Sequence, residues 1–251
     1  MYKGVPYRVR PASEWAEEVR QAAALVPDAR RVFLADGDVM ALGFPRLRSI
    51  LDDVRAAFPL ASRISLYANG RSILAKSKPE LEELRRRGLH TLYMGLESGD
   101  QSLLDEVKKG ETAEEMIAAA GRAQACGLRM SVMILIGLAG PERSAAHADA
   151  TADALNRMQP RLLSALRFIP ILGTELGDRV ISGEVPASSE DEAISELGRL
   201  ISRLSLRRTV FRANHRSNVI PLEGRLPRDQ ASLLRRLGAS RRSLPPAPCR
   251  T

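Results

Sequence analysis

Cysteines, aromatic residues and long apolar runs are all scarce in this sequence. Its 251 residues include two cysteines, Cys126 and Cys249, which are too few for a disulfide framework and are typical of a reducing compartment. No apolar run reaches the roughly 18 residues that a membrane-spanning helix needs. We therefore expect a cytoplasmic protein without a membrane partner, and the sequence argues against the disulfide-rich secreted classes.

The scarcity of aromatic residues bears on nucleic-acid binding. The net charge is +8 and the pI is about 10.1, a balance that can attract an anionic partner such as RNA. An alanine- and arginine-rich chain is equally basic without any nucleic-acid role. Aromatic residues make up 4% of the chain, which leaves few rings for base stacking, and no RNA-binding motif is present. RNA is therefore a candidate partner that no motif supports.

Short apolar segments do occur, and they alternate with segments suited to helices. The expected strands are Val32–Leu34, Ile64–Tyr67, Thr91–Met94, Met130–Ile136 and Leu162–Ile169. Alternation at this spacing predicts a parallel sheet with right-handed crossovers. A (β/α) barrel, full or partial, and an open doubly wound sheet both satisfy the pattern, and both bind ligands at the carboxyl ends of their strands.

Helix signals lie between and after these strands. Ser13 is a candidate N-cap, and Thr112 with Glu115 forms a capping box that opens a helix ending near Cys126. The character of the chain changes after Gly177. We divide it into an α/β region at 1–177, a C-terminal helical extension at 178–238, and a proline-rich tail at 239–251 that we expect to be disordered.

Polar and glycine residues follow each expected strand. They are Asp36-Gly37-Asp38, Asn69 with Arg71, Glu97-Ser98, Gly137 to Gly140, and Gly173-Thr174. In a parallel sheet these groups meet at one edge, where glycine lets the backbone approach a ligand. Carboxylates can accept hydrogen bonds from an amino group or from ribose hydroxyls, and an arginine can pair with a ligand carboxylate. The set suits a zwitterionic ligand that carries a nucleoside.

Each of these groups also has a purely structural interpretation. The two aspartates can cap the segment that follows them, and Asn69 with Arg71 can form a turn. Glu97 can cap the next helix or pair with Arg71, and Gly137 with Gly140 can simply allow a turn. The coincidence of five strand ends favours the ligand.

Four segments resemble motifs of the radical S-adenosylmethionine (SAM) superfamily, in particular the branch of oxygen-independent coproporphyrinogen oxidase and the elongator catalytic subunit. They are LADGD (34–38), YMGLESG (93–99), MILIGLAG (133–140) and RFIPILGTEL (167–176). The resemblance covers roughly residues 1–176. It implies an α/β fold, a partial parallel (β/α) barrel whose first strand is missing, with a small C-terminal extension. It also implies SAM as a cofactor and, in the family, a four-iron, four-sulfur (4Fe-4S) cluster whose chemistry yields a 5′-deoxyadenosyl radical; the substrate is unknown.

The resemblance further implies roles for single residues. Asp36 to Asp38 would contact the methionine amino group, although the family usually has Gly-Gly-Glu there. Glu97 would lie near the ribose or the amino-acid part, and Leu135 beside the adenine. The full set of expected SAM-binding residues is Asp36, Gly37, Asp38, Asn69, Arg71, Glu97, Ser98, Leu135, Gly137 and Ile169. The catalytic residues are left open, and we expect no metal-binding residue.

The family's CxxxCxxC motif, whose thiolates hold the cluster, is absent from the sequence. Cys126 and Cys249 cannot supply three thiolates, and we expect them to be a packed helix-end residue and a tail residue. We expect Met1 to be an internal or misassigned start, with the first strand and the cysteine loop encoded upstream. The prediction is a radical SAM family protein whose standing as an enzyme is open. The alternative is a cluster-less SAM- or nucleotide-binding barrel with a regulatory or scaffold role.

Overall fold

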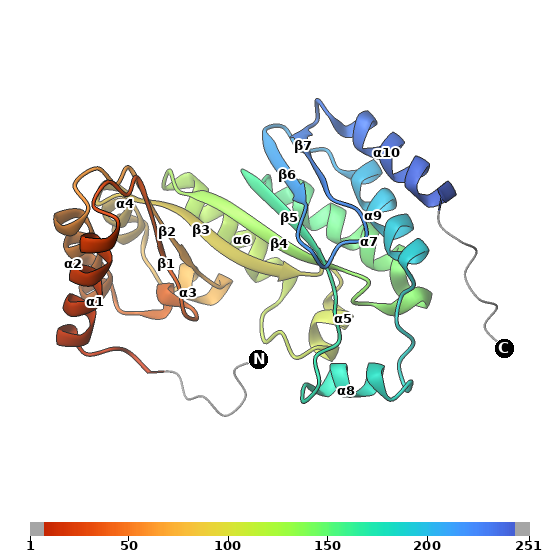
Figure 1. The fold of residues 1–251 in the computed structure, drawn as a ribbon, viewed down its shortest axis with the longest axis horizontal. Coiled ribbons are helices and arrows are strands. Elements are labelled where there is room, and N and C mark those ends of the chain that lie inside the picture. The colour runs from red at the N-terminus through yellow and green to blue at the C-terminus, as the bar shows by residue number, and fades with distance from the viewer. Residues whose placement is uncertain (1–7, 244–251) are drawn as a thin grey trace. The chain divides into compact units, whose positions relative to one another are not determined.

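A computed structural model describes residues 8–243 and contains a seven-stranded sheet (Figure 1). Its strands are β1 (Arg31–Leu34), β2 (Arg63–Tyr67), β3 (Leu89–Glu97), β4 (Arg129–Ile136), β5 (Leu162–Arg167), β6 (Thr209–Ala213) and β7 (Leu222–Leu226), and they lie in that order. The pairs β1–β2, β2–β3, β4–β5 and β5–β6 are parallel, and β6–β7 is antiparallel. Within the described residues β1 and β7 are the sheet edges, so the fold is an unclosed, partial (β/α) barrel.

Helices connect the strands. They are α1 (Ala12–Leu25), α2 (Phe44–Ala57), α3 (Gly70–Leu74), α4 (Lys78–Arg86), α5 (Gln101–Glu106), α6 (Ala113–Ala125), α7 (Gly140–Met158), α8 (Glu175–Ile181), α9 (Glu190–Arg203) and α10 (Gln230–Ser243), with a 3-10 helix η1 (Val39–Ala41). In the described part of the chain, no helix is both long and apolar enough to cross a membrane.

The chain divides into two compact units. Of the described residues, the N-terminal unit comprises 8–94 and 118–130, and the C-terminal unit comprises 95–117 and 131–243. In the N-terminal unit α1 packs beside α2 (Figure 1). Leu47, Leu51 and Val54 recur at helical spacing on α2 and are buried, because this face of the helix covers the core. The result is an amphipathic helix with a charged outer face.

The core of the C-terminal unit includes the contact between α7 and α9. Ile194, Leu197 and Ile201 form a buried stripe on α9, and Ala148 and Ala152 are buried on α7. A capping box opens α9: the Ser189 N–H donates to Glu192, and the Glu192 N–H donates to the Ser189 hydroxyl. Small residues on α7 allow the two helices to approach closely.

Every predicted strand is present, and the bounds differ by a few residues. The strand expected to stop at Gly95 continues to Glu97 as β3. The capping box of Thr112 and Glu115 is confirmed, because each backbone N–H donates to the other side chain. Ser13 is not an N-cap, since α1 begins at Ala12 after Pro11.

The sequence missed β7 and the short helices α3, α5 and α8. Helix α10 runs to Ser243, four residues beyond the expected start of the tail, and residues 244–251, including Cys249, lie outside the described residues. The expected helical extension also contributes the two strands β6 and β7. Its boundary at 177/178 stays a prediction.

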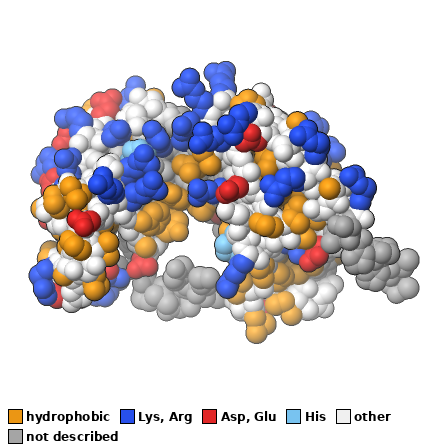
Figure 2. All heavy atoms as spheres, turned by 45° about the horizontal axis from the view of Figure 1, so that its top comes forward, with side chains coloured by type: hydrophobic (Ala, Val, Ile, Leu, Met, Phe, Trp, Pro, Cys, Tyr) orange, Lys and Arg blue, Asp and Glu red, His pale blue; other side chains and the backbone are white. Residues whose placement is uncertain are grey.

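Lys and Arg side chains dominate the charged groups on the face drawn in Figure 2, in keeping with the net charge of +8.

Candidate functional site

A strained turn ends β3 at Glu97, one of the residues expected to bind SAM. Glu97 has a φ of +61°, and the Ser98 N–H donates to the Leu96 carbonyl over 2.7 Å. This three-residue γ-turn with positive φ is rare and costs energy in a residue other than glycine. Glu97 does not cap the next helix, because Asp100 is the N-cap of α5. Backbone strain at a residue that caps nothing points to a function for its side chain.

The Glu97 carboxylate folds back over Gly95. A Cβ at Gly95 would overlap Glu97 Oε1 and lie 3.2 Å from Lys109 Nζ. Lys109 donates to Glu97 Oε1 over 3.1 Å, with 20% of the Lys109 side chain and 26% of the Glu97 side chain exposed. A carboxylate and an ammonium therefore stand together, half-buried, at the end of β3. Such a pair matches the amino and carboxylate groups of a zwitterion.

The three residues that follow Glu97, which are Ser98, Gly99 and Asp100, hold this turn in place. The Ser98 side chain is fully buried, and its hydroxyl lies 2.8 Å from His147 Nδ1 and accepts from the Asp100 N–H. A Cβ at Gly99 would overlap the Ala150 carbonyl, so only glycine lets the turn pack on α7. Asp100 accepts from the Ser102 and Leu103 N–H groups. Burial opposes ionisation of Asp100, but these hydrogen bonds outweigh it and lower its pKa.

A second turn with positive φ ends β4. Gly137 has a φ of +80°, its N–H donates to Glu196 Oε1 over 2.7 Å, and a Cβ there would lie 3.3 Å from Ser188 Cβ. Leu135 on β4 is partly exposed, and 55% of Ile169 beyond β5 is exposed. Leu135 and Ile169 therefore offer apolar surface to a ligand. A larger residue at 137 would strain the fold itself, so a substitution there cannot report on a ligand alone.

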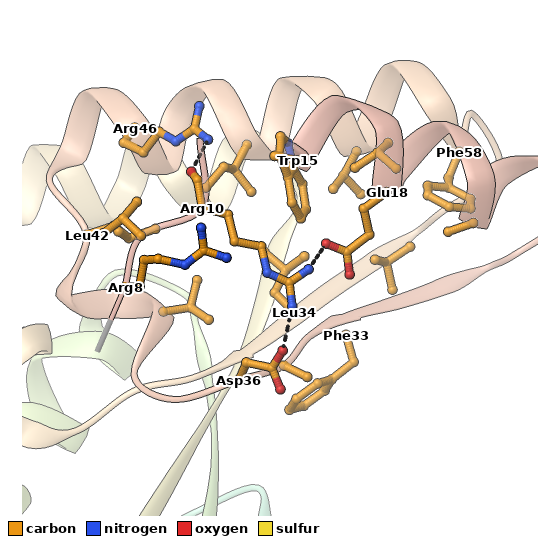
Figure 3. Close-up of a pocket in the computed structure, with 18 residues that line it drawn as sticks. Arg8, Arg10, Trp15, Glu18, Phe33, Leu34, Asp36, Leu42, Arg46 and Phe58 are labelled. Atoms are coloured by element: carbon orange, nitrogen blue, oxygen red, sulfur yellow. Dashed lines mark hydrogen bonds and ion pairs between the residues drawn. The ribbon is translucent and has the colours of Figure 1, made fainter. Parts of the chain in front are cut away.

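In the N-terminal unit, Asp36 and Gly37 have φ values of +67° and +76° directly after β1. The Asp36 carboxylate pairs with Arg10 over 3.0 Å, and Arg10 also pairs with Glu18 (Figure 3). Asp36 lines a cavity of about 270 Å³ between α1, β1 and α2. Most of the lining side chains are apolar, and they include Trp15 and Phe58. The predicted Asp36 thus lies at the charged rim of an apolar cavity.

Asp38 and Asn69 come together as the strand pattern predicts. The Ser72 hydroxyl donates to Asp38 Oδ1 over 3.0 Å, and the Ser72 N–H donates to Asn69 Oδ1 over 2.8 Å. Asn69 is the N-cap of α3, whereas the structural alternative considered from the sequence was a turn with Arg71. Lys76 is buried nearby and donates to the Met40 carbonyl. Burial lowers its pKa, against the opposing charges of Glu80 and Asp38.

The sequence analysis missed four side chains around the β3 and β4 ends. Lys109 is in a lysine-glycine loop, and His147, Thr151 and Glu196 lie on helices far along the chain. His147, Thr151 and Glu196 are buried at 1%, 0% and 2% exposure. One signal for them was available in the sequence. His147 and Thr151 are four residues apart, so they lie on the same face of a helix that is otherwise rich in alanine.

The side chains of the described residues do not form a metal site. No group of three His, Cys, Asp or Glu residues within 8–243 could hold a metal ion. Cys126 is buried at the end of α6, and burial raises the pKa of its thiol, as expected for a packed residue. With two cysteines in the whole sequence, these 251 residues do not fit a cluster held by three thiolates.

Comparison with known proteins identifies the family. The sequence model of the Radical SAM superfamily matches residues 2–149, which is more than half of the chain. The chain belongs to the radical SAM superfamily. Membership implies SAM-dependent radical chemistry in general, with SAM and a 4Fe-4S cluster in family members. The matched residues include the turns after β1, β2, β3 and β4.

One curated relative and several solved structures are similar to this radical SAM protein. An uncharacterized protein of Methanopyrus kandleri is 30% identical over 241 residues, covering 89% of this chain and 44% of the relative. The chain therefore spans less than half the length of that curated relative. Archaeal Elp3 of Methanocaldococcus infernus has a TM-score of 0.64 at 15% identity, over 90% of this chain and 59% of that one. Coproporphyrinogen III oxidase of Escherichia coli, a radical SAM enzyme, has a TM-score of 0.60 at 16% identity, over 76% and 44%. At these identities the structural likeness establishes the shared fold.

Proposed function

We propose that this chain binds SAM, and that its C-terminal unit holds the adenosyl and amino-acid parts at the turns that end β3 and β4. The observation that carries the proposal is the strained Glu97 turn, within the residues matched by the family model. Glu97 would accept hydrogen bonds from the ribose or the amino group, and Lys109 would face the carboxylate. Leu135 and Ile169 would contact the adenine. The expected SAM-binding residues of the N-terminal unit stay predictions; they are Asp36, Gly37, Asp38, Asn69 and Arg71.

The donor set fits this cofactor. A half-buried carboxylate 3.1 Å from an ammonium offers complementary charges to a zwitterion, and a partly buried site screens them less than water does. Bound SAM supplies the adenosyl group for radical chemistry in the superfamily. The residues of this chain would bind and orient it. With two cysteines, these 251 residues do not fit an iron–sulfur cluster held by three thiolates.

Calorimetric titration of SAM into the purified chain tests the proposal. Glu97→Gln keeps the shape of the side chain and removes its charge, so we expect about tenfold weaker binding or more, as for loss of one charged hydrogen bond. Glu175→Gln is the matched control, because Glu175 pairs with the neighbouring Lys108 at an exposed position. Equal affinities of the wild-type chain and Glu97→Gln, or no SAM binding by the wild-type chain, would reject the site.

A second function is a cluster-less SAM- or nucleotide-binding protein with a regulatory or scaffold role. The cysteine count favours it for these 251 residues. Formation of 5′-deoxyadenosine from SAM, after anaerobic reconstitution with iron and sulfide and with dithionite as the electron donor, would reject it. An RNA partner stays a prediction, and its test is an RNA affinity that falls with rising salt.

A further inference from the structure

A buried polar network links the two turns of the candidate site through α7 and α9. Its members are Ser98, His147, Thr151, Ser144 and Glu196. Ser98 Oγ lies 2.8 Å from His147 Nδ1, and the Gly99 N–H donates to Thr151 Oγ1 over 3.0 Å. These contacts anchor the Glu97 turn of β3 to α7.

The other side of the same histidine reaches the β4 turn. His147 Nε2 lies 3.0 Å from the Leu135 carbonyl and 3.5 Å from Glu196 Oε1. Glu196 Oε1 accepts from the Gly137 N–H over 2.7 Å, and Glu196 Oε2 accepts from the Ser144 hydroxyl. One histidine thus connects the strand end that carries Glu97 with the strand end that carries Gly137.

The hydrogen bonds of the network run in a consistent direction. The Leu135 carbonyl can only accept, so His147 carries a proton on Nε2. In the neutral ring Nδ1 accepts from the Ser98 hydroxyl, which itself accepts from the Asp100 N–H. Each partner donates where its neighbour accepts. Buried polar groups satisfied in this way favour one rigid arrangement.

The serine, histidine and glutamate do not form a hydrolytic triad. In a triad the serine lies on the histidine Nε2 side and the acid on the Nδ1 side. Here Ser98 is on the Nδ1 side and Glu196 on the Nε2 side. Ser98 and His147 are 0% and 1% exposed, so no substrate reaches the hydroxyl. The network therefore has a structural output.

We propose that Ser98, His147, Thr151 and Glu196 are positioning residues that hold the strained Glu97 turn and the Gly137 turn in their ligand-binding geometry. The proposal rests on the proposed function, since it takes both turns to contact SAM. A positive φ at Glu97 persists only where surrounding contacts fix it, and this network supplies them. The α7 helix acts as the shared support of both strand ends.

Two isosteric substitutions test the network with matched cost to stability. Thr151→Val removes a buried hydroxyl inside the network, and Thr209→Val removes one outside it, where Thr209 donates to the Pro160 carbonyl over 2.6 Å. Both threonines are buried, at 0% and 2% exposure. Thr151→Ser retains the hydroxyl and is the rescue variant. Ser98→Ala tests the second anchor of the turn.

Amide hydrogen exchange and SAM titration are the two measurements. We expect Thr151→Val and Ser98→Ala to speed exchange of the Gly137 amide at least tenfold and to weaken SAM binding at least fivefold. Thr209→Val and Thr151→Ser should leave both unchanged. Unchanged Gly137 exchange in Thr151→Val and Ser98→Ala would overturn the network. Faster exchange with unchanged SAM affinity would overturn its positioning role. A wild-type chain that binds no SAM would reject the proposed function, and the exchange data would still decide whether the network couples the turns.

Discussion

Gly95 is a glycine because the Glu97 side chain occupies the space that a Cβ would fill. We therefore expect Gly95→Ala to push the carboxylate away from Lys109 while β3 stays intact, since the obstructing atom is the end of a flexible side chain. Binding of SAM should weaken about as much as in Glu97→Gln, and Gly95→Ala combined with Glu97→Gln should add little. Calorimetry on the two single variants and the double variant measures this. Full additivity would show that Gly95 has a separate role.

At the residue scale the sequence pointed to the turn at Glu97 and missed the side chains that contact it. Glu97 could be found because it follows an apolar strand directly. Lys109 could not, because nothing in a lysine-glycine loop distinguishes the lysine that folds inward from the neighbour that does not. Asn69 illustrates the opposite case: its side chain is in the capping box of a five-residue helix too short to leave a periodic pattern. Local propensity cannot separate a cap from a ligand contact.

At the scale of helices, two glycines weaken elements without serving a turn. At Gly121 in α6 and Gly198 in α9, an added Cβ would have no heavy atom of another part of the fold within 4 Å. Replacing either with alanine should raise the free energy of unfolding by about 0.5–1 kcal/mol, because alanine loses less backbone entropy. In a chain of this size, each kcal/mol of added stability raises the melting temperature by about 2–4 °C. Thermal unfolding of the two variants checks it, and a lower melting temperature would show that either glycine is needed for packing.

The starts of the strands in the N-terminal unit carry positive charge around His90. Its pKa is lowered to about 4, first by burial and then by Arg129, Arg63 and Arg85. The unfolded chain, with an ordinary histidine pKa near 6.5, takes up the proton first as the pH falls. Protonation therefore favours unfolding between about pH 6.5 and about pH 4, and this contribution to stability is complete above that range.

The substitution His90→Gln removes that contribution. We expect urea unfolding to show a smaller loss of stability from about pH 7 to about pH 5 in the variant than in the wild-type chain. Arg63→Gln should raise the His90 pKa, seen by NMR titration of its ring proton, and added salt should raise it partly because salt screens the arginines but not the burial. A His90 that titrates near 6.5 in the folded wild-type chain would contradict the argument.

The element scale was the most predictable from sequence. Apolar strands of four to nine residues and amphipathic helices leave a period that survives in a single sequence, so β1 to β5 and the long helices were found. The missed helices α3, α5 and α8 have five to seven residues, about two turns at most. Their capping and packing come from tertiary contacts, which no local window contains.

At the scale of the whole molecule, family and cysteine count pull in different directions. The family model matches residues 2–149, yet the sequence has two cysteines where a cluster needs three thiolates. Cys126 is buried, and its raised pKa disfavours the thiolate that binds iron.

After anaerobic reconstitution with iron and sulfide, we expect the 251-residue chain to retain no stoichiometric iron and no cluster absorbance. Cys126→Ala should give the same result, and the measurements are iron analysis and the visible spectrum. SAM titration of the same samples separates cofactor binding from cluster binding, because the Glu97 and Gly137 turns are complete without a cluster. If the wild-type chain retains iron and Cys126→Ala does not, the Cys126 thiol is an iron ligand and the prediction is wrong.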